Sequence, residues 1–558
     1  MHHTGPIAGI AAHGDLLATA GYDNAVILWD ARQRKALSRG SHDHLVNHCS
    51  FSADGRWLVT ASSDYSARVW SVPTLRLHAV LAEHDDDVDM AAFSPDGRFI
   101  ATCALDRCVR IFDCDGRCLR TMHGHTGNVL SIAWRSDSRQ VVSSSVDGTL
   151  RHWDVERGVE VQSTDLQVRT DSVEIDPNGV VYAGDDRGRI VMIDGVGTSM
   201  VQAHSAGIKK VALDVRRGAI VALSYDRTMS IWRTDGTPQL HEVRRTTCPA
   251  VIWARAAAIL DDGRVAAGTF GGSYALFDPE TDAWDLEGAT PGDGVNAVLS
   301  VDRHIYTVGD AGVVRADGAP VAQMGSLCNF LVDVDGRLLT GGQLGRLFDA
   351  RTGEVLYEHH SPLNCGVAFT RWGTPHVAVG TYTGEVLIFD GWQTGAPQRM
   401  ASLAVYENAV KGLSCSGGLL FSVCASTEIS WHDVDDWSLV KRVPRAHDKI
   451  ANACCAIDDG RFASVARDRT LRIWHTDVSE TYESPHANSV KCLGVNADRT
   501  RLLTGSYGGT VAMFDVPSRR WVSLERPTTA GISSITWDDR HQQFLAASYD
   551  GAVYTVHV

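Results

Sequence analysis

The chain has 558 residues, of which 44% are hydrophobic, and a formal net charge of −15. This length exceeds what a single core fills and predicts two or more domains. The acidic balance argues against a nucleic-acid partner, and no run approaches the roughly 20 consecutive apolar residues of a membrane span. The N-terminus lacks the basic region of a signal peptide, and the 13 cysteines are scattered and odd in number. We therefore expect a cytoplasmic protein with reduced thiols.

A short closing motif recurs from one end of the chain to the other, with a period of about 40 residues. It consists of a hydrophobic run, then Trp or Phe, then usually Asp, as in Ile27-Leu28-Trp29-Asp30 and Met513-Phe514-Asp515. Fourteen copies can be counted, including degenerate ones near Ile193 and Val314. A period of this length is typical of a propeller array.

One repeat, residues 123–157, shows how each copy is expected to fold. Strands are predicted over residues 129–134, 141–145 and 150–153, and a fourth, outer strand over 159–162. Asp147-Gly148 is a tight hairpin signal between the second and third strands. Four short antiparallel strands form one blade, which becomes stable only when neighbouring blades pack face to face around a ring. No segment has sustained helical periodicity, so the chain is predicted to be all-β.

The opening His, the Asp of the second turn and the closing Trp-Asp resemble the WD-repeat family over essentially the whole chain. In that family, His, a second-strand Ser or Thr, the turn Asp and the Trp form a buried, hydrogen-bonded tetrad. The best matches, in chain order, are His3, Asp23 and Trp29; His42, Asp64 and Trp70; His125, Asp147 and Trp153; His204, Asp226 and Trp232; and His447, Asp468 and Trp474. His84, Asp106 and Phe112 lack only the indole. A His–Asp–Ser set that is repeated five times indicates a scaffold rather than a catalytic triad.

Fourteen blades exceed the usual 4–8 blades of one ring. The chain is therefore predicted to be two seven-bladed WD-repeat propellers in tandem, over residues 1–288 and 289–558, divided at the loose stretch 288–294. Repeats five and seven to eleven depart from the pattern, and Gly271 and Thr383 replace the turn Asp. Either hydrophobic packing alone holds the first half of the second ring, or the strand boundaries expected there are wrong.

The sequence leaves two possibilities for how the last blade is completed. The chain begins on a first strand, residues 7–11, and stops on a third strand, residues 552–558. Either blade fourteen has three strands, or another segment completes it, namely the first few residues or the region around Trp284. An uncovered edge strand would be an aggregation risk.

Site motifs for phosphate, dinucleotide, zinc-protease or serine-hydrolase chemistry are absent from the sequence. Two clusters resemble metal sites: Cys103, Cys108, Cys114 and Cys118, and His42, His44, His48 and Cys49. Cys108 and Cys114 lie at opposite ends of one strand, about 20 Å apart, and His42 is needed for its tetrad. We therefore expect strand packing, with no metal and no cofactor.

The residue just before the turn Asp, or before its replacement, is expected to point onto the top face of each ring, which WD-repeat proteins commonly use for partners. Aromatic residues hold this position at Tyr22, Tyr225 and Phe270 in the first ring and at Tyr382, Tyr507 and Tyr549 in the second. Exposed aromatics that cluster on a rim are typical of interface hot spots. The alternative is that aromatics simply suit strand ends.

The sequence thus favours a non-enzymatic scaffold that binds one or more protein partners through the top faces of its propellers. One alternative is a propeller hydrolase that acts at a central channel. The other is a sensor or regulatory subunit of a toxin, defence or signalling system, because the predominance of arginine over lysine suggests a GC-rich, bacterial genome.

Overall fold

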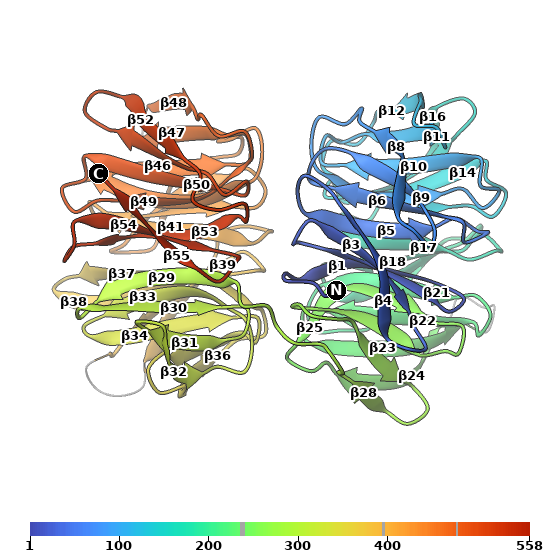
Figure 1. Cartoon of the computed structure of the whole chain (residues 1–558), viewed down its shortest axis with the longest axis horizontal. Coiled ribbons are helices and arrows are strands. Elements are labelled where there is room, and N and C mark those ends of the chain that lie inside the picture. Colours follow the sequence, from blue (N-terminus) through green and yellow to red (C-terminus); the bar gives the residue numbers. More distant parts are fainter. Residues whose placement is uncertain (235–239, 393–396, 476–477) are drawn as a thin grey trace. The chain divides into compact units, whose positions relative to one another are not determined.

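The computed structural model describes residues 1–234, 240–392, 397–475 and 478–558, which form β-strands and the turns between them (Figure 1). The chain divides into two compact units, Met1–Gly292 and Asp293–Val558, called ring 1 and ring 2 below. Each holds seven antiparallel sheets, which confirms the predicted all-β fold of two seven-bladed propellers. The described residues form no helix that is long and apolar enough to cross a membrane.

Ring 1 has seven four-stranded blades, each built from consecutive strands. Their strands are β1 (Ile7–His13), β2 (Leu16–Gly21), β3 (Ala25–Asp30), β4 (Lys35–Ser41); β5 (Val46–Phe51), β6 (Trp57–Ser62), β7 (Ala67–Ser71), β8 (Arg76–Leu81); β9 (Val88–Phe93), β10 (Phe99–Ala104), β11 (Val109–Asp113), β12 (Cys118–Met122); β13 (Val129–Trp134), β14 (Gln140–Ser145), β15 (Thr149–Asp154), β16 (Val159–Asp165); β17 (Thr170–Ile175), β18 (Val181–Asp185), β19 (Arg189–Ile193), β20 (Thr198–Gln202); β21 (Ile208–Asp214), β22 (Ala219–Ser224), β23 (Thr228–Thr234), β24 (Leu240–Thr247); and β25 (Ile252–Ile259), β26 (Val265–Thr269), β27 (Ala275–Asp278), β28 (Ala283–Asp285).

Ring 2 repeats this order in blades eight to fourteen. Its strands are β29 (Val295–Val301), β30 (His304–Gly309), β31 (Val313–Ala316), β32 (Ala319–Gln323); β33 (Cys328–Val334), β34 (Arg337–Gly342), β35 (Arg346–Asp349), β36 (Val355–Glu358); β37 (Leu363–Arg371), β38 (Thr374–Thr381), β39 (Glu385–Asp390), β40 (Gln398–Ala404); β41 (Val410–Ser416), β42 (Leu419–Cys424), β43 (Ile429–Asp433), β44 (Leu439–Val443); β45 (Ala451–Asp458), β46 (Arg461–Ala466), β47 (Thr470–Trp474), β48 (Ser479–Glu483); β49 (Val490–Val495), β50 (Arg501–Ser506), β51 (Val511–Asp515), β52 (Arg520–Glu525); and β53 (Ile532–Asp538), β54 (Gln543–Ser548), β55 (Val553–His557).

The core of each ring lies between adjacent blades. The second strands are buried on both faces because a neighbouring blade covers each side, whereas outer strands such as β4 alternate between exposed and half-buried residues. Ile7, Leu17 and Ile27 of blade one pack against Tyr274 and Leu276 of blade seven. A similar apolar cluster lies between blades nine and ten, in which the tetrad is missing. Hydrophobic contacts between blades therefore contribute to holding blades nine and ten together.

Ring 1 closes where blade one meets blade seven. Innermost strands β1 and β25 are neighbours, and His3 forms a β-bridge with Gly272. The Arg34 guanidinium donates to Asp285 at 2.7 Å and to the Tyr274 carbonyl at 2.6 Å. The segment up to Gly292 also belongs to this ring, because the Gly292 N–H donates to the Phe270 carbonyl at 3.3 Å. The units divide after residue 292, which lies in the stretch 288–294 and four residues beyond the boundary expected after residue 288.

Ring 2 closes where blade fourteen meets blade eight. Innermost strands β53 and β29 are neighbours, and Ser300 Oγ donates to Asp538 at 3.0 Å across this junction. Blade fourteen is a three-stranded sheet of β53, β54 and β55 in the described residues. Trp284 lies instead in β28, the outer strand of blade seven, and the first residues pair with that same blade. Neither segment proposed as a clasp for blade fourteen has that role here.

Candidate functional site

The His–Asp–hydroxyl sets lie in buried hydrogen-bonded networks. Burial lowers the pKa of His42 despite its bond to Asp64, so the ring is neutral. Its Nδ1–H donates to Asp64 at 2.8 Å, the Thr60 hydroxyl donates to Nε2 at 2.7 Å, and the Trp70 indole donates to Thr60 at 2.8 Å. A hydroxyl buried beneath an indole cannot reach a substrate, so this set stabilises the turn rather than catalysing a reaction.

The other predicted sets have the same hydrogen bonds, except that in one set the hydroxyl comes from a different strand. The turn Asp lies 2.9–3.2 Å from His Nδ1, and a hydroxyl lies 2.7–2.8 Å from Nε2, in the sets of His3, His125, His204 and His447. His204 uses Ser230 of the third strand instead of a second-strand hydroxyl. His84 contacts Asp106 and Thr102 without an indole. Sequence reasoning missed His486, which bonds Thr504 and Thr510, because Gly508 replaces its turn Asp.

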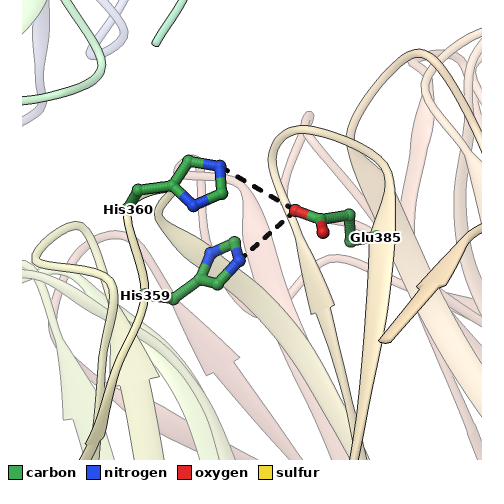
Figure 2. Close-up of side chains that lie close together, drawn as sticks. All are labelled: His359, His360 and Glu385. Carbon is green, nitrogen blue, oxygen red and sulfur yellow. Dashed lines mark ion pairs between the residues drawn. The ribbon is translucent and has the colours of Figure 1, made fainter. Parts of the chain in front are cut away.

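Blade ten replaces its tetrad with a different cluster, His359, His360 and Glu385 (Figure 2). The two His Nε2 atoms lie 3.3 and 3.9 Å from Glu385 Oε2, and the candidate ligand atoms all lie within 4.8 Å of one another. Two imidazoles and a carboxylate are a donor set that divalent transition metals bind. The hydrogen bond from His359, together with the other contacts, lowers the pKa of Glu385 to about 2.

The protons of this cluster point to a structural role. The Ser361 N–H donates to His359 Nδ1 at 3.1 Å, and His359 Nε2 donates to Glu385, which lies 3.3 Å away. Ser402 Oγ also donates to Glu385, at 3.1 Å. A metal would have to displace a proton that is already hydrogen-bonded. Thr383 stands where other blades have the turn Asp, and Glu385 takes over the role of that Asp as the acceptor for the histidine.

A β-bulge at the start of every innermost strand creates the more prominent site. The register slips by one residue at the second position in six strands of ring 1, as between Ile7 and Gly9, and in all seven of ring 2. Bulges re-aim side chains and are frequent beside functional sites. The bulged residue and the residue that follows the second strand lie together, because the N–H of Tyr22, for example, donates to the Pro6 carbonyl directly before β1. These two positions surround one end of the central channel of each ring. We call this end the channel mouth.

The mouth of ring 1 contains a cavity of about 80 Å³. Its walls include residues from all seven innermost strands, which places it on the axis of the ring. Several of the lining residues are ionisable or polar: Tyr22, Asn47, His48, Asp89, Asp171, Lys209, Lys210 and Arg255. Four of the seven lysines of the chain, Lys209, Lys210, Lys411 and Lys491, lie at or beside bulged positions.

Most charges of ring 1 neutralise one another. Arg169 Nε lies 2.8 Å from Asp171, and Lys209 forms ion pairs with both Asp171 and Asp186. Although burial opposes ionisation, Arg169 and Lys209 hold the pKa of Asp171 below its ordinary value. Lys210 lies 3.5 Å from Glu174. These pairs form a charged network that is largely withdrawn from solvent.

Blade seven differs from the other blades because its bulge is wider. Between the pairs Ile252–Thr269 and Ala257–Ala267, strand β25 holds four residues against one on β26. This bulge carries Trp253 and Arg255. Arg255 is an exposed residue, and its guanidinium lies 5.6 Å from the Trp253 ring and donates to the Tyr22 hydroxyl at 3.3 Å.

Two of the three aromatic residues of the arc predicted in ring 1 lie at the mouth, and partner binding by the arc stays a prediction. Tyr22 and Tyr225 are half-buried at the mouth, Tyr22 packs edge-on against Trp253 at 5.0 Å, and Lys209 lies 4.8 Å over the Tyr225 ring. The expectation that Phe270 is exposed is wrong, because its side chain is 3% exposed and packs against Trp253 at 6.1 Å. Phe270 thus supports the exposed face of the mouth instead of contributing to it.

Ring 2 has amide groups where ring 1 has charges. Side chains at the bulged position donate to the carbonyl of the first residue of the next innermost strand, which links blade to blade around the axis. These bonds are Asn296 to Cys328 at 3.1 Å, Asn329 to Leu363 at 2.9 Å, Asn364 to Val410 at 2.5 Å, Asn452 to Val490 at 2.7 Å, and Ser533 to Val295. Asn47 to Val88, at 3.0 Å, is the counterpart in ring 1. Lys411 and Lys491 hold the two remaining positions in ring 2.

The predicted tyrosines of ring 2 surround this amide ring. Tyr382, Tyr507 and Tyr549 are half-buried; Lys411 lies 5.6 Å over Tyr382 and Arg467 lies 5.8 Å over Tyr507. Burial and the neighbouring Tyr507 raise the pKa of Tyr549. In blade eight the same position is Asp310, which accepts from Asn296 at 2.9 Å; burial raises its pKa to about 7. Binding by these tyrosines stays a prediction.

Sequence reasoning missed the bulged residues because a bulge leaves no mark in an alternating strand pattern. One signal was available. Lysine is rare in this chain, yet it recurs directly after the first apolar residue of an innermost strand, at Lys209, Lys411 and Lys491. Trp253 and Arg255 had no such repeat-based signal, since only blade seven has the wider bulge.

Comparison with known proteins gives matches that agree with this architecture. The family described as "WD domain, G-beta repeat" matches residues 1–30, 35–71, 75–113, 116–154, 438–475 and 479–515. A CCR4-associated factor 4 homolog of Candida glabrata is 28% identical over 229 residues, which are 38% of this chain and 33% of the relative.

Two further relatives show more distant similarity. WD repeat-containing protein 55 of Bos taurus is 23% identical over 187 residues, covering 32% of this chain and 48% of that protein. Transcription initiation factor TFIID subunit 5 of Caenorhabditis elegans is 25% identical over 186 residues, which are 32% of this chain and 29% of that protein. The matched part thus spans between about a third and a half of these relatives. Together with the fourteen blades and their tetrads, these matches show that the chain contains WD repeats and resembles WD-repeat proteins.

Proposed function

We propose that the chain is a non-enzymatic cytoplasmic scaffold, which binds protein partners through the channel mouths of its two propellers. The observation that carries the proposal is the group of Tyr22, Trp253 and Arg255 at the mouth of ring 1. Tyrosine, tryptophan and arginine are the residues that dominate protein–protein hot spots. Tyr382 and Tyr507, each beside a cation, offer a similar surface in ring 2.

The relatives support an interaction role in general terms. One is named as an associated factor and another as a subunit of a transcription factor. Because this chain covers less than half of each, their partners are not transferred to it. The buried tetrads also favour a scaffold over a hydrolase, since their hydroxyls are already bonded to imidazole and indole.

Affinity purification of the full chain from cells of its source tests this proposal. A double variant, Tyr22→Ala with Tyr225→Ala, probes ring 1, and Tyr382→Ala with Tyr507→Ala probes ring 2. Loss of one hot spot weakens binding by roughly 2 kcal/mol or more, about thirtyfold, so at least one pair is expected to release a stoichiometric partner.

Trp372→Ala is the matched control. Trp372 is 75% exposed and lies in the hairpin between β37 and β38, at the opposite end of its blade from Tyr382. This variant is expected to retain the partner. Absence of any stoichiometric partner, or turnover in a screen of sugar, lactone and phosphate esters, would contradict the proposed function.

A further inference from the structure

The guanidinium of Arg255 is an incompletely satisfied cation at the mouth of ring 1. The residue is exposed, and its guanidinium donates to the Tyr22 hydroxyl at 3.3 Å; Asp89 and Asp171 attract its charge, but neither forms an ion pair with it within 4.0 Å among the described residues. Neighbouring cations differ, because Arg169 and Lys209 share Asp171 and Asp186 as partners. Arg255 can therefore accept an anion without breaking an ion pair.

The wide bulge of β25 holds this side chain in place. Trp253 is 8% exposed and packs between Tyr22 at 5.0 Å and Phe270 at 6.1 Å. The guanidinium lies 5.6 Å from that indole, so aromatic rings flank it. A preorganised arginine loses less side-chain entropy when it binds a partner than a free one does.

The other ionisable groups of the cavity differ from Arg255. Lys209 and Lys210 also line it, but each already forms an ion pair with a carboxylate, whereas Arg255 has no such partner at ion-pair distance among the described residues. Burial, and then Lys210, lower the pKa of His48 to about 3, so its ring is neutral. The Nδ1 atom of His48 is buried and lacks a hydrogen-bond partner among the described residues. Because the other ring nitrogen hydrogen-bonds to the Ala91 backbone, this nitrogen can accept a hydrogen bond from a ligand but cannot donate one to a carboxylate.

The size of the cavity favours a side chain over a complete small molecule. Its volume is about 80 Å³. Pockets that enclose small ligands usually measure roughly 300–1,000 Å³. A carboxylate with one or two methylene groups is the monoanion of matching size, and it can form two parallel hydrogen bonds with a guanidinium.

We infer that Arg255 binds the carboxylate of an aspartate or glutamate side chain, presented by an extended acidic segment of a protein partner. This inference rests on the proposed function and names the chemistry of the partner for ring 1. The net charge of −15 repels an acidic segment in general, so such binding has to arise from the local charges of the mouth.

Fluorescence anisotropy with the full chain tests the inference directly. The probe is a fluorescein-labelled peptide of alternating glycine and glutamate, and the same peptide with glutamine is the neutral control. We expect saturable binding of the glutamate peptide, at least tenfold weaker binding to Arg255→Ala, and an intermediate affinity for Arg255→Lys, which keeps the charge but loses the planar fork.

Arg98→Ala is the matched control variant. Arg98 lies in the hairpin between β9 and β10 of the same ring, and its side chain is 70% exposed. This variant removes the same charge from the opposite end of a blade and is expected to bind the probe like the unmodified chain. Equal affinity of Arg255→Ala and the unmodified chain, or no binding of the glutamate peptide, would overturn the inference.

Competition with free anions distinguishes a carboxylate on a peptide from a small free anion as the ligand of this site. Glutarate and inorganic phosphate are titrated as competitors at equal concentration. If glutarate displaces the probe as well as the unlabelled peptide does, the site takes a free dicarboxylate, and the inference is wrong. Tighter binding of phosphate than of the peptide would overturn it as well, because the site would then prefer a dianion.

The inference and the proposed function can fail separately. A partner that co-purifies with the unmodified chain and equally with Arg255→Ala would support the scaffold and refute the carboxylate site. Absence of any partner, with probe binding that depends on Arg255, would refute the scaffold and leave an anion site in the channel.

Discussion

Ring 1 and ring 2 share a fold and the same bulged position at the mouth, but different chemistry fills that position. In ring 1 the mouth contains ion pairs among Arg169, Asp171, Asp186 and Lys209. In ring 2 a series of amides donates to backbone carbonyls of the neighbouring blades. The bulge determines where a side chain points, and the residue type determines whether it joins blades or carries charge.

This difference has an energetic meaning. An amide that satisfies a buried carbonyl contributes about 1 kcal/mol. Buried ion pairs often contribute little net stability, because desolvation offsets their attraction. The amide ring of ring 2 is therefore well suited to stabilise its mouth, whereas the ion pairs of ring 1 are expected to add little net stability.

Removal of a shared carboxylate should have the largest effect. Asp171→Ala leaves Asp186 to balance both Arg169 and Lys209, which are largely buried, so we expect a loss of about 3–5 kcal/mol in the free energy of unfolding. Chemical denaturation followed by tryptophan fluorescence measures it. Asp43→Ala, which removes an exposed ion-pair partner of Arg68 in the same ring, should change stability by less than about 1 kcal/mol. Equal effects would remove the distinction between the network and surface pairs.

The two rings should respond to pH in opposite directions. Because the pKa of Asp310 is about 7 in the fold and near 3.8 when unfolded, the folded state binds the extra proton between pH 4 and 7, and stability falls as pH rises through that window. Asp310→Asn should therefore stabilise ring 2 by about 2–4 kcal/mol at pH 8 and have little effect at pH 4.

Asp171 provides the contrast. Its folded pKa lies below the ordinary value, so its contribution is present above pH 4 and is lost as pH falls. Thermal melting of both variants across pH 4–8 checks these signs. If Asp310→Asn is destabilising at pH 8, the carboxylate has a binding partner that its hydrogen bond from Asn296 does not reveal.

The His42–Asp64 tetrad of ring 1 should contribute more to stability than the Glu385 cluster, which replaces a tetrad in ring 2. Asp64→Ala removes the acceptor for buried His42 and should cost about 1–3 kcal/mol. Glu385→Ala is expected to cost about 1 kcal/mol or less, because its side chain is 28% exposed and water can replace it. Thermal denaturation of the two variants side by side tests the order. A larger loss for Glu385→Ala would show that this cluster has a role beyond the turn.

The smallest effect is expected for one amide of ring 2. Asn452→Ala removes the bond to the Val490 carbonyl and should lower the free energy of unfolding by about 1 kcal/mol. Asn178, exposed in a turn of ring 1, is the control, and its alanine variant should be neutral within about 0.5 kcal/mol. Equal stability of both variants would mean that the amide ring does not join the blades of ring 2.

Much of the architecture was predictable because it depends on local, repeated signals. The spacing from His42 to Asp64 and Trp70 marks one turn, one hairpin and one closing strand, and each repetition strengthens the prediction of a blade. Tyr22 and Tyr225 were identified by the same repeat. Phe270 was misjudged because its exposure depends on Trp253, which packs over it from a different strand.

The sequence by itself determined the all-β propeller architecture, the number of blades and the positions of the tetrads, since periodicity and turn residues act over short distances. Only the tertiary structure decided which side chains meet at the axis. Arg255 and Tyr22 are 233 residues apart and come together because blade seven closes onto blade one. The bulge that aims Arg255 is a slip in strand register, and register depends on the pairing partner rather than on the residues of one strand.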